Sequence, residues 1–189
     1  QARQEAAKRS AKINFFNLDF NKSFDLPENT FDLVSCCFAI YYAENVPFTI
    51  REMKRVIKPG GRLFTTGPMP ENKQLFYDII REATDNRPIP PMPGSSRYAS
   101  EFLDVIQNEF SKVDVQIFEN PLTFEKVEPF VSYVRASLSE DRKLWSYFFQ
   151  SKDEFQWIME RIENVAAQRM TQDGKLVMTK VVGGFIATK

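Results

Sequence analysis

The residues that could do chemistry lie where two apolar runs end. The first run, residues 13–20 (INFFNLDF), has Asp19 next to its last position. The second run, residues 31–40 (FDLVSCCFAI), carries Cys37 and Phe38 among its last four residues. An ionised aspartate only accepts hydrogen bonds, so Asp19 would pair with a hydrogen-bond donor. Histidine is absent, which excludes imidazole bases and imidazole metal sites, and no visible cluster of other side chains requires a metal.

Hydrophobic patterning predicts that a parallel α/β sheet positions these side chains. Both apolar runs are nearly continuous, as in strands that a sheet buries on both faces. Residues 47–61 (PFTIREMKRVIKPGG) predict a helix that the Pro-Gly-Gly at its end terminates, and residues 62–68 predict a strand. Strand, helix and strand in this order form a right-handed βαβ crossover with parallel strands. Ligands bind at the carboxyl edge of such a sheet, where Asp19 is expected.

The second half of the chain changes from strands to helices. Residues 72–85 predict a helix, and Ser100 can cap a second, shorter one. Residues 111–120 and 175–189 predict strands. The 126–172 segment between them predicts two helices, one of which begins with a Ser-x-x-Glu capping box.

Four motifs resemble a known family. They are residues 17–20 (NLDF), 26–27 (LP), 29–34 (NTFDLV) and 51–61 (REMKRVIKPGG). Their order and spacing resemble the class I S-adenosylmethionine-dependent methyltransferases of the ubiquinone/menaquinone-methyltransferase-like (methyltransferase type 11) group. The resemblance covers residues 13–68, and the terminal KVVGGFIATK resembles the last strand of the same fold. The implied fold class is α/β, with a Rossmann-like class I methyltransferase sheet.

The resemblance assigns four residues to the cofactor, S-adenosylmethionine. It implies that Asp19 accepts a hydrogen bond from the adenine N6 amino group and that the Phe20 N–H donates to adenine N1. It implies that Cys37 and Phe38 line the methionine-sulfonium region. The alternative for Asp19 is a turn carboxylate at the end of a strand. Asp32 matches an acid that lies away from the ligand edge, so we interpret it as structural.

Two tyrosines follow the second strand, where family members face the methyl acceptor. We expect Tyr42, in preference to Tyr41, to be the catalytic candidate that orients or deprotonates an acceptor. The ordinary pKa of a phenol, about 10, makes a tyrosine a poor base. Aromatic packing at a strand–helix corner is an equal alternative for both residues.

The family's glycine-rich loop and its ribose-binding acid are not found in these residues. Both belong upstream of residue 1, so we expect a fragment whose sheet is incomplete at the N-terminus. The pair Gly60-Gly61 is no substitute, because it follows a helix and precedes a strand, the reverse of a phosphate loop.

The helical segment is the other departure from the family's minimal fold, in which a short link joins the last two strands. We expect one partial methyltransferase domain over residues 1–189, with residues 126–172 as a helical insertion before the last strand. The insertion could act as a lid whose aromatic side chains wall an acceptor pocket, or these side chains could pack its helices onto the body or a partner. The aromatic residues concerned are Phe130, Tyr133, Trp145, Tyr147, Phe148, Phe149 and Trp157.

The function expected is methyl transfer from S-adenosylmethionine, by direct SN2 displacement, to a small hydrophobic or aromatic acceptor. The alternative is a catalytically inactive binding or scaffold protein with the methyltransferase fold. Equal numbers of basic and acidic residues, 25 each, give no electrostatic case for nucleic acid, and no apolar run could span a membrane. The adjacent Cys36 and Cys37 are typical of a reduced, cytoplasmic protein. The sequence leaves a homo-oligomer open.

Overall fold

The computed structural model describes residues 2–90, 97–140, 145–146 and 148–189. The α-helices are α1 (Ala2–Lys8), α2 (Val46–Val56), α3 (Gln74–Ala83), α5 (Leu103–Glu109), α6 (Val127–Glu140) and α8 (Lys152–Asp173). The strands are β1 (Phe31–Cys37), β2 (Ile57–Pro68), β3 (Lys112–Phe124) and β4 (Leu176–Thr188). A 3-10 turn (Ile40–Tyr42) follows β1, and a π-helical turn (Tyr98–Phe102) leads into α5. Within these described residues no helix is long and apolar enough to cross a membrane.

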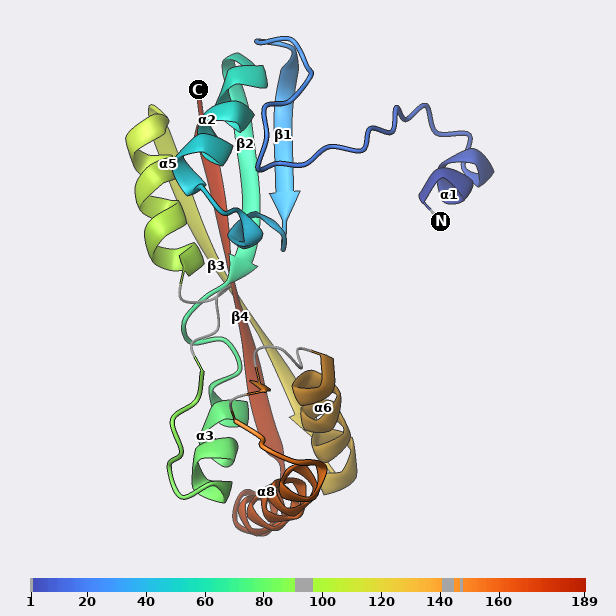
Figure 1. Cartoon of the computed structure of the whole chain (residues 1–189), viewed down its shortest axis with the longest axis vertical. Coiled ribbons are helices and arrows are strands. Elements are labelled where there is room, and N and C mark those ends of the chain that lie inside the picture. Colours follow the sequence, from blue (N-terminus) through green and yellow to red (C-terminus); the bar gives the residue numbers. More distant parts are fainter. Residues whose placement is uncertain (1, 91–96, 141–144, 147) are drawn as a thin grey trace.

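The four strands form one sheet in the order β1-β2-β4-β3. The strands β1 and β2 are parallel and are joined through α2, which confirms the predicted βαβ crossover and the α/β fold class. The strand β4 runs antiparallel to both β2 and β3. Figure 1 shows that β3 and β4 extend well beyond the carboxyl ends of β1 and β2 as a long two-stranded ribbon.

Local sequence explains α2. The Asn45 side chain caps its start by accepting the Phe48 N–H at 3.1 Å, and Pro47 occupies its first turn. The predicted end is too late, because the helix stops at Val56 and β2 begins at once. The Pro-Gly-Gly segment instead forms a bend inside the strand, where Gly60 adopts φ +75°.

The predicted strand over residues 13–20 is wrong, because this segment is irregular in the structure. Its apolar side chains are largely exposed, with Phe16 at 65% and Ile13 at 55%. A strand needs a neighbour for its backbone hydrogen bonds, and in the described part of the chain β1 pairs with β2 alone. Hydrophobicity alone therefore did not make this segment a strand.

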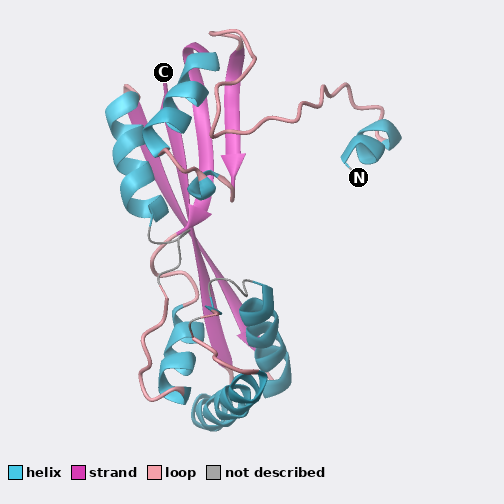
Figure 2. Cartoon of the chain, viewed as in Figure 1, coloured by secondary structure: helices cyan, strands magenta, loops and turns pink. Residues whose placement is uncertain are grey.

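Two hydrophobic cores lie on opposite faces of the β3–β4 ribbon. The core of the sheet lobe packs α2 and α5 against odd-numbered residues of β4 such as Phe185 and Ala187. The core of the helical lobe packs α3, α6 and α8 against even-numbered residues such as Leu176 and Met178. Because side chains alternate along a strand, the buried face of β4 changes between Met178 and Val181. Figure 2 shows the resulting separate groups of helices.

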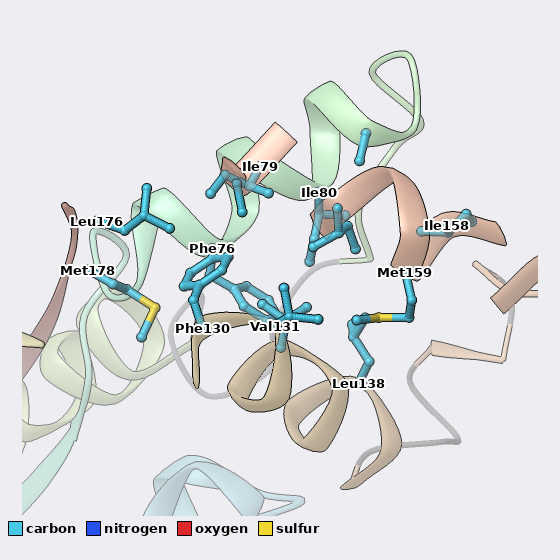
Figure 3. Packing of buried hydrophobic residues seen from close by; sticks show 14 of the residues in the cluster. Phe76, Ile79, Ile80, Phe130, Val131, Leu138, Ile158, Met159, Leu176 and Met178 are labelled. Carbon is cyan, nitrogen blue, oxygen red and sulfur yellow. The ribbon is translucent and has the colours of Figure 1, made fainter. Parts of the chain in front are cut away.

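The helical lobe contains both helices that the 126–172 segment predicts. The Ser151 Oγ accepts the Glu154 N–H at 3.0 Å, and Gly174 ends α8 at φ +74°. Figure 3 shows α3, α6 and α8 meeting through apolar side chains that include Phe76, Phe130 and Met159. Ser100 is no cap, because its helix already begins at Tyr98 and Ser100 lies inside the first turn.

Candidate functional site

The carboxyl end of β1 carries the predicted sulfonium-side residues. Cys37 is exposed, and Phe38 turns the chain with a left-handed φ of 52° while its N–H donates to the Thr66 carbonyl at 2.9 Å. Half of the Phe38 side chain remains accessible. The neighbouring Cys36 points into the sheet lobe, and burial raises its pKa to about 11, so it is an unreactive thiol at neutral pH.

The two tyrosines that follow have different environments. Tyr41 packs against the core of the sheet lobe, and burial raises its pKa. Tyr42 is 68% exposed, and its ring centroid lies 4.8 Å from that of Tyr41. Tyr42 is therefore the more accessible of the two hydroxyls at this edge.

Asp19 lies in an exposed turn that the rest of the sheet lobe holds close to this edge. Its carboxylate accepts the Asn21 N–H at 3.0 Å, and Lys22 Nζ lies 3.5 Å away. The Asn21 N–H and then Lys22 lower the pKa of Asp19, so the side chain remains an anionic acceptor. No other described residue accepts a hydrogen bond from the Phe20 N–H.

A set of hydrogen bonds from α2 fixes the segment that carries Asp19 and Phe20. The Thr49 hydroxyl donates to the Phe20 carbonyl at 3.1 Å, and Glu52 accepts the Phe24 N–H at 2.9 Å. Arg55 donates to the carbonyls of Phe24 and Leu26, both at 2.9 Å, and also pairs with Glu52. Sequence reasoning missed these roles, and the only signal for them is the i, i+3 spacing of Glu52 and Arg55.

A second link joins this segment to the 3-10 turn, because the Asn21 side chain accepts the Glu44 N–H at 2.9 Å. The structure thus brings the Asp19–Phe20 turn and the loop after β1 to the same end of the sheet. The strand prediction for residues 13–20 failed, yet the expected placement of its last residues is retained through α2.

The end of β2 adds polar groups to this edge. The Thr66 Oγ1 atom is buried and has no hydrogen-bond partner among the described residues, although Thr66 lies directly beside Cys37 in the sheet. An unpaired buried hydroxyl is costly unless a ligand or water pairs with it. Thr65 on the opposite face bonds the buried Tyr98 hydroxyl at 2.9 Å. An acceptor-only carboxylate, a free N–H and an orphaned hydroxyl are groups that fit a nucleoside-containing cofactor.

The helical lobe lies beyond this edge, where the ribbon continues past the ends of β1 and β2 (Figure 1). It contains a cavity of about 330 Å³ with an apolar lining that includes Trp145, Phe149 and Phe155. Leu138 and Ser139 of α6 close one side, and the first residues of α8 close another. A cavity of this size is at the lower end of the range of small-molecule sites.

The aromatic side chains of the insertion have different roles. Phe130 and Phe148 are buried in the core of the helical lobe, where they pack the helices together. Trp145 and Phe149 contact the same core and also line the cavity. Trp157 is 46% exposed beside the Arg161 guanidinium, and Tyr147 lies outside the described residues.

The described residues contain no group of three acids or cysteines that could hold a metal ion. The negatively charged groups at the site are instead tied to hydrogen-bond donors of the chain, as Asp19 and Glu52 are.

Comparison with known proteins shows similarity in part of the sequence and in the fold. The family model described as "Methyltransferase domain" matches residues 1–65. A curated relative, the polyketide synthase-nonribosomal peptide synthetase of Aspergillus clavatus, is 30% identical over 129 residues, which are 62% of this chain. The chain spans only 3% of the length of that protein.

Two solved structures share the fold over the whole of this chain. The YcgJ protein from Bacillus subtilis has a TM-score of 0.57 and 15% identity, with 76% of its own length covered. A putative methyltransferase from Bacillus halodurans has a TM-score of 0.56 and 16% identity, with 77% of its length covered. The first third of the chain thus matches a methyltransferase domain, and the described chain as a whole has the fold of these two structures.

Proposed function

We propose that this protein transfers a methyl group from S-adenosylmethionine to a small hydrophobic or aromatic acceptor. The observation that carries the proposal is the aromatic cavity in the helical lobe, beyond the carboxyl ends of β1 and β2. Ligands of open α/β sheets bind at this edge, so a lobe there can cover an acceptor. The resemblance of residues 13–68 to the ubiquinone/menaquinone-methyltransferase-like group also favours an apolar acceptor.

The residues of the edge have separate roles in this proposal. Asp19 and the Phe20 N–H bind the adenine ring, and Cys37 and Phe38 lie beside the methionine end. When bound, the cofactor supplies an electrophilic methyl group. Tyr42 orients the acceptor's nucleophilic atom through its exposed hydroxyl. The residues of α2 act earlier, because they hold the adenine-side turn in place before any ligand arrives.

In the same proposal residues 1–189 form one partial methyltransferase domain. The helical segment over residues 126–172 is a lid on this domain. The lid excludes water from the transferring methyl group and supplies apolar contact to the acceptor. Its core, which includes the buried Phe130 and Phe148, packs against Trp145 and Phe149 of the cavity wall.

The Asp19→Asn variant is expected to weaken binding of S-adenosylhomocysteine by about tenfold or more, because one amide oxygen replaces an anionic acceptor. Isothermal titration calorimetry measures the affinity, and Asp25→Asn, another exposed acid of the same segment, is the control. An unchanged affinity would remove Asp19 from the adenine site. Failure of the unmodified protein to bind S-adenosylhomocysteine at high micromolar concentration would contradict the proposed function itself.

The Ser139→Trp variant is expected to fill the cavity and lower kcat/KM for the acceptor by about tenfold or more, with unchanged affinity for S-adenosylhomocysteine. Transfer of radiolabelled methyl groups to a panel of small aromatic hydroxyl compounds measures the loss. Ser132→Trp is the matched control, because Ser132 is exposed on the same helix but does not line the cavity. Equal activity of both variants would show that the acceptor binds elsewhere.

A further inference from the structure

Three partly buried polar side chains from separate segments meet at the junction of the two lobes. They are Lys73, just before α3, Tyr133 of α6 and Lys180 of β4, which we name the Lys–Tyr–Lys cluster. The two ammonium nitrogens lie 5.3 Å (Lys73) and 5.6 Å (Lys180) from the centroid of the Tyr133 ring. Both ammonium groups thus lie close to the Tyr133 ring, and together they lower the pKa of its hydroxyl.

Backbone hydrogen bonds place this cluster close to the carboxyl edge. The Met69 N–H donates to the Val181 carbonyl at 3.0 Å, and the Lys73 N–H donates to the Thr179 carbonyl at 2.9 Å. Lys180 lies two residues beyond Val182, which is the last partner of β2 in the sheet. At the rise of a strand, its Cα is about 7 Å past the end of β2.

The cluster carries positive charge that no described carboxylate neutralises. Lys54 and Lys58 each pair with an acid, whereas neither Lys73 nor Lys180 has an ion-pair partner among the residues that the structure describes. Burial raises the pKa of Tyr133, but the hydrogen bonds and charges of the two lysines outweigh this effect and lower it overall. The site thus stabilises negative charge at the hydroxyl position of Tyr133.

The start of α3 adds to the positive electrostatic potential at the cluster. Its N-cap residue is Lys73, whose side chain cannot accept a hydrogen bond, so no side chain caps the positive end of the helix dipole. Tyr77 of α3 also interacts with Tyr133; burial and then Tyr133 raise the pKa of Tyr77 to about 12, so it is neutral at physiological pH.

We propose that the Lys–Tyr–Lys cluster binds an oxyanion, the carboxylate or phosphate group of the methyl acceptor. The proposal rests on the proposed function and adds to it: the acceptor has an apolar body and an acidic group. Two ammonium groups and a phenol O–H together offer charge-assisted hydrogen bonds to the oxygens of such a group. The cluster and the cavity both use α6, on which Leu138 lies about 7.5 Å along the axis and about 140° around it from Tyr133, so an acceptor that used both would curve around this helix.

Binding of small aromatic probes to the unmodified protein tests this proposal without methyl transfer. Benzoate and phenyl phosphate are titrated by calorimetry, with neutral benzamide as the uncharged match. The anionic probes are expected to bind at least about tenfold more tightly than benzamide. Whichever of the two anions binds more tightly assigns the acidic group as a carboxylate or a phosphate.

Variants of the cluster locate the binding. Lys73→Met and Lys180→Met are each expected to weaken binding of the anionic probes by about tenfold, while Lys126→Met, an exposed lysine of the same lobe, leaves it unchanged. Lys180→Arg retains the charge and is expected to retain binding. This variant keeps the test informative if the methionine variants unfold.

Two results would overturn the anion site: benzamide binding as tightly as benzoate, or an equal loss in Lys126→Met. Both differ from failure of the proposed function, which is tested separately by binding of S-adenosylhomocysteine.

Discussion

The Phe130→Ala variant is expected to lower the free energy of unfolding of the helical lobe by about 3–5 kcal/mol. Phe130 is fully buried at the centre of that lobe, and its ring meets the Phe124 ring edge-on at 5.4 Å. Removing the ring leaves a cavity between α6 and the end of the β3–β4 ribbon. Since the sheet lobe has its own core on the other face of the ribbon, α2 is expected to be less affected.

Amide hydrogen exchange measures this difference helix by helix. Faster exchange in α6 and α8, with little change in α2, is the expected result. Phe16→Ala is the matched control, because Phe16 is mostly exposed and its loss should change stability by less than about 0.5 kcal/mol. Phe130→Leu restores part of the volume if the alanine variant fails to fold. Equal acceleration in α2 and α8 would show that the lobes unfold as one unit.

The sequence predicts the elements whose signals are local. The helix α2 has a cap and an apolar stripe, and the structure confirms the crossover that these signals imply, although the Pro-Gly-Gly expected to end the helix lies inside β2. Residues 13–20 have only hydrophobicity, and a strand also needs a partner for its backbone. No described strand pairs with this segment, and the side chains of Phe16 and Leu18 are exposed.

The candidate site also has a part that the sequence predicts and a part that it does not. Asp19, Phe38 and Tyr42 lie at one end of the sheet as the strand-end rule suggests. The Lys–Tyr–Lys cluster could not be predicted, because its members are far apart in the sequence and no sequence pattern links them. Their meeting depends on β4 running past β2 and on α6 packing against the other face of the ribbon, which are both long-range features.

The change of buried face along β4 separates two lobes, for which we propose different roles. The sheet lobe positions the groups expected to bind the cofactor, and the helical lobe contains the aromatic cavity and the cluster. Because a continuous strand joins them, the distance along the ribbon between these groups is fixed by backbone hydrogen bonds and not by a loop. Such rigid spacing suits a reaction in which two bound molecules must be held in line.

The Gly67→Ala variant is expected to lower the free energy of unfolding of the sheet lobe by about 1–3 kcal/mol. A Cβ at Gly67 would lie 2.6 Å from Cγ of the Tyr98 ring. That ring cannot move away, because it is fully buried, stacks on Phe185 at 4.3 Å and bonds Thr65 through its hydroxyl. Chemical denaturation followed by fluorescence or circular dichroism measures the loss.

Gly184→Ala separates this clash from the general effect of replacing a strand glycine. Gly184 lies on the neighbouring strand opposite Thr66, and its added Cβ would meet Phe64 and Phe118 at 3.6 and 3.7 Å, which are ordinary contacts. This variant should be neutral, or more stable by up to about 1 kcal/mol, because alanine restricts the unfolded chain. If Gly67→Ala were equally harmless, the ring of Tyr98 would have to be free to shift. Such a result would show that the contact between Gly67 and Tyr98 does not stabilise the end of β2.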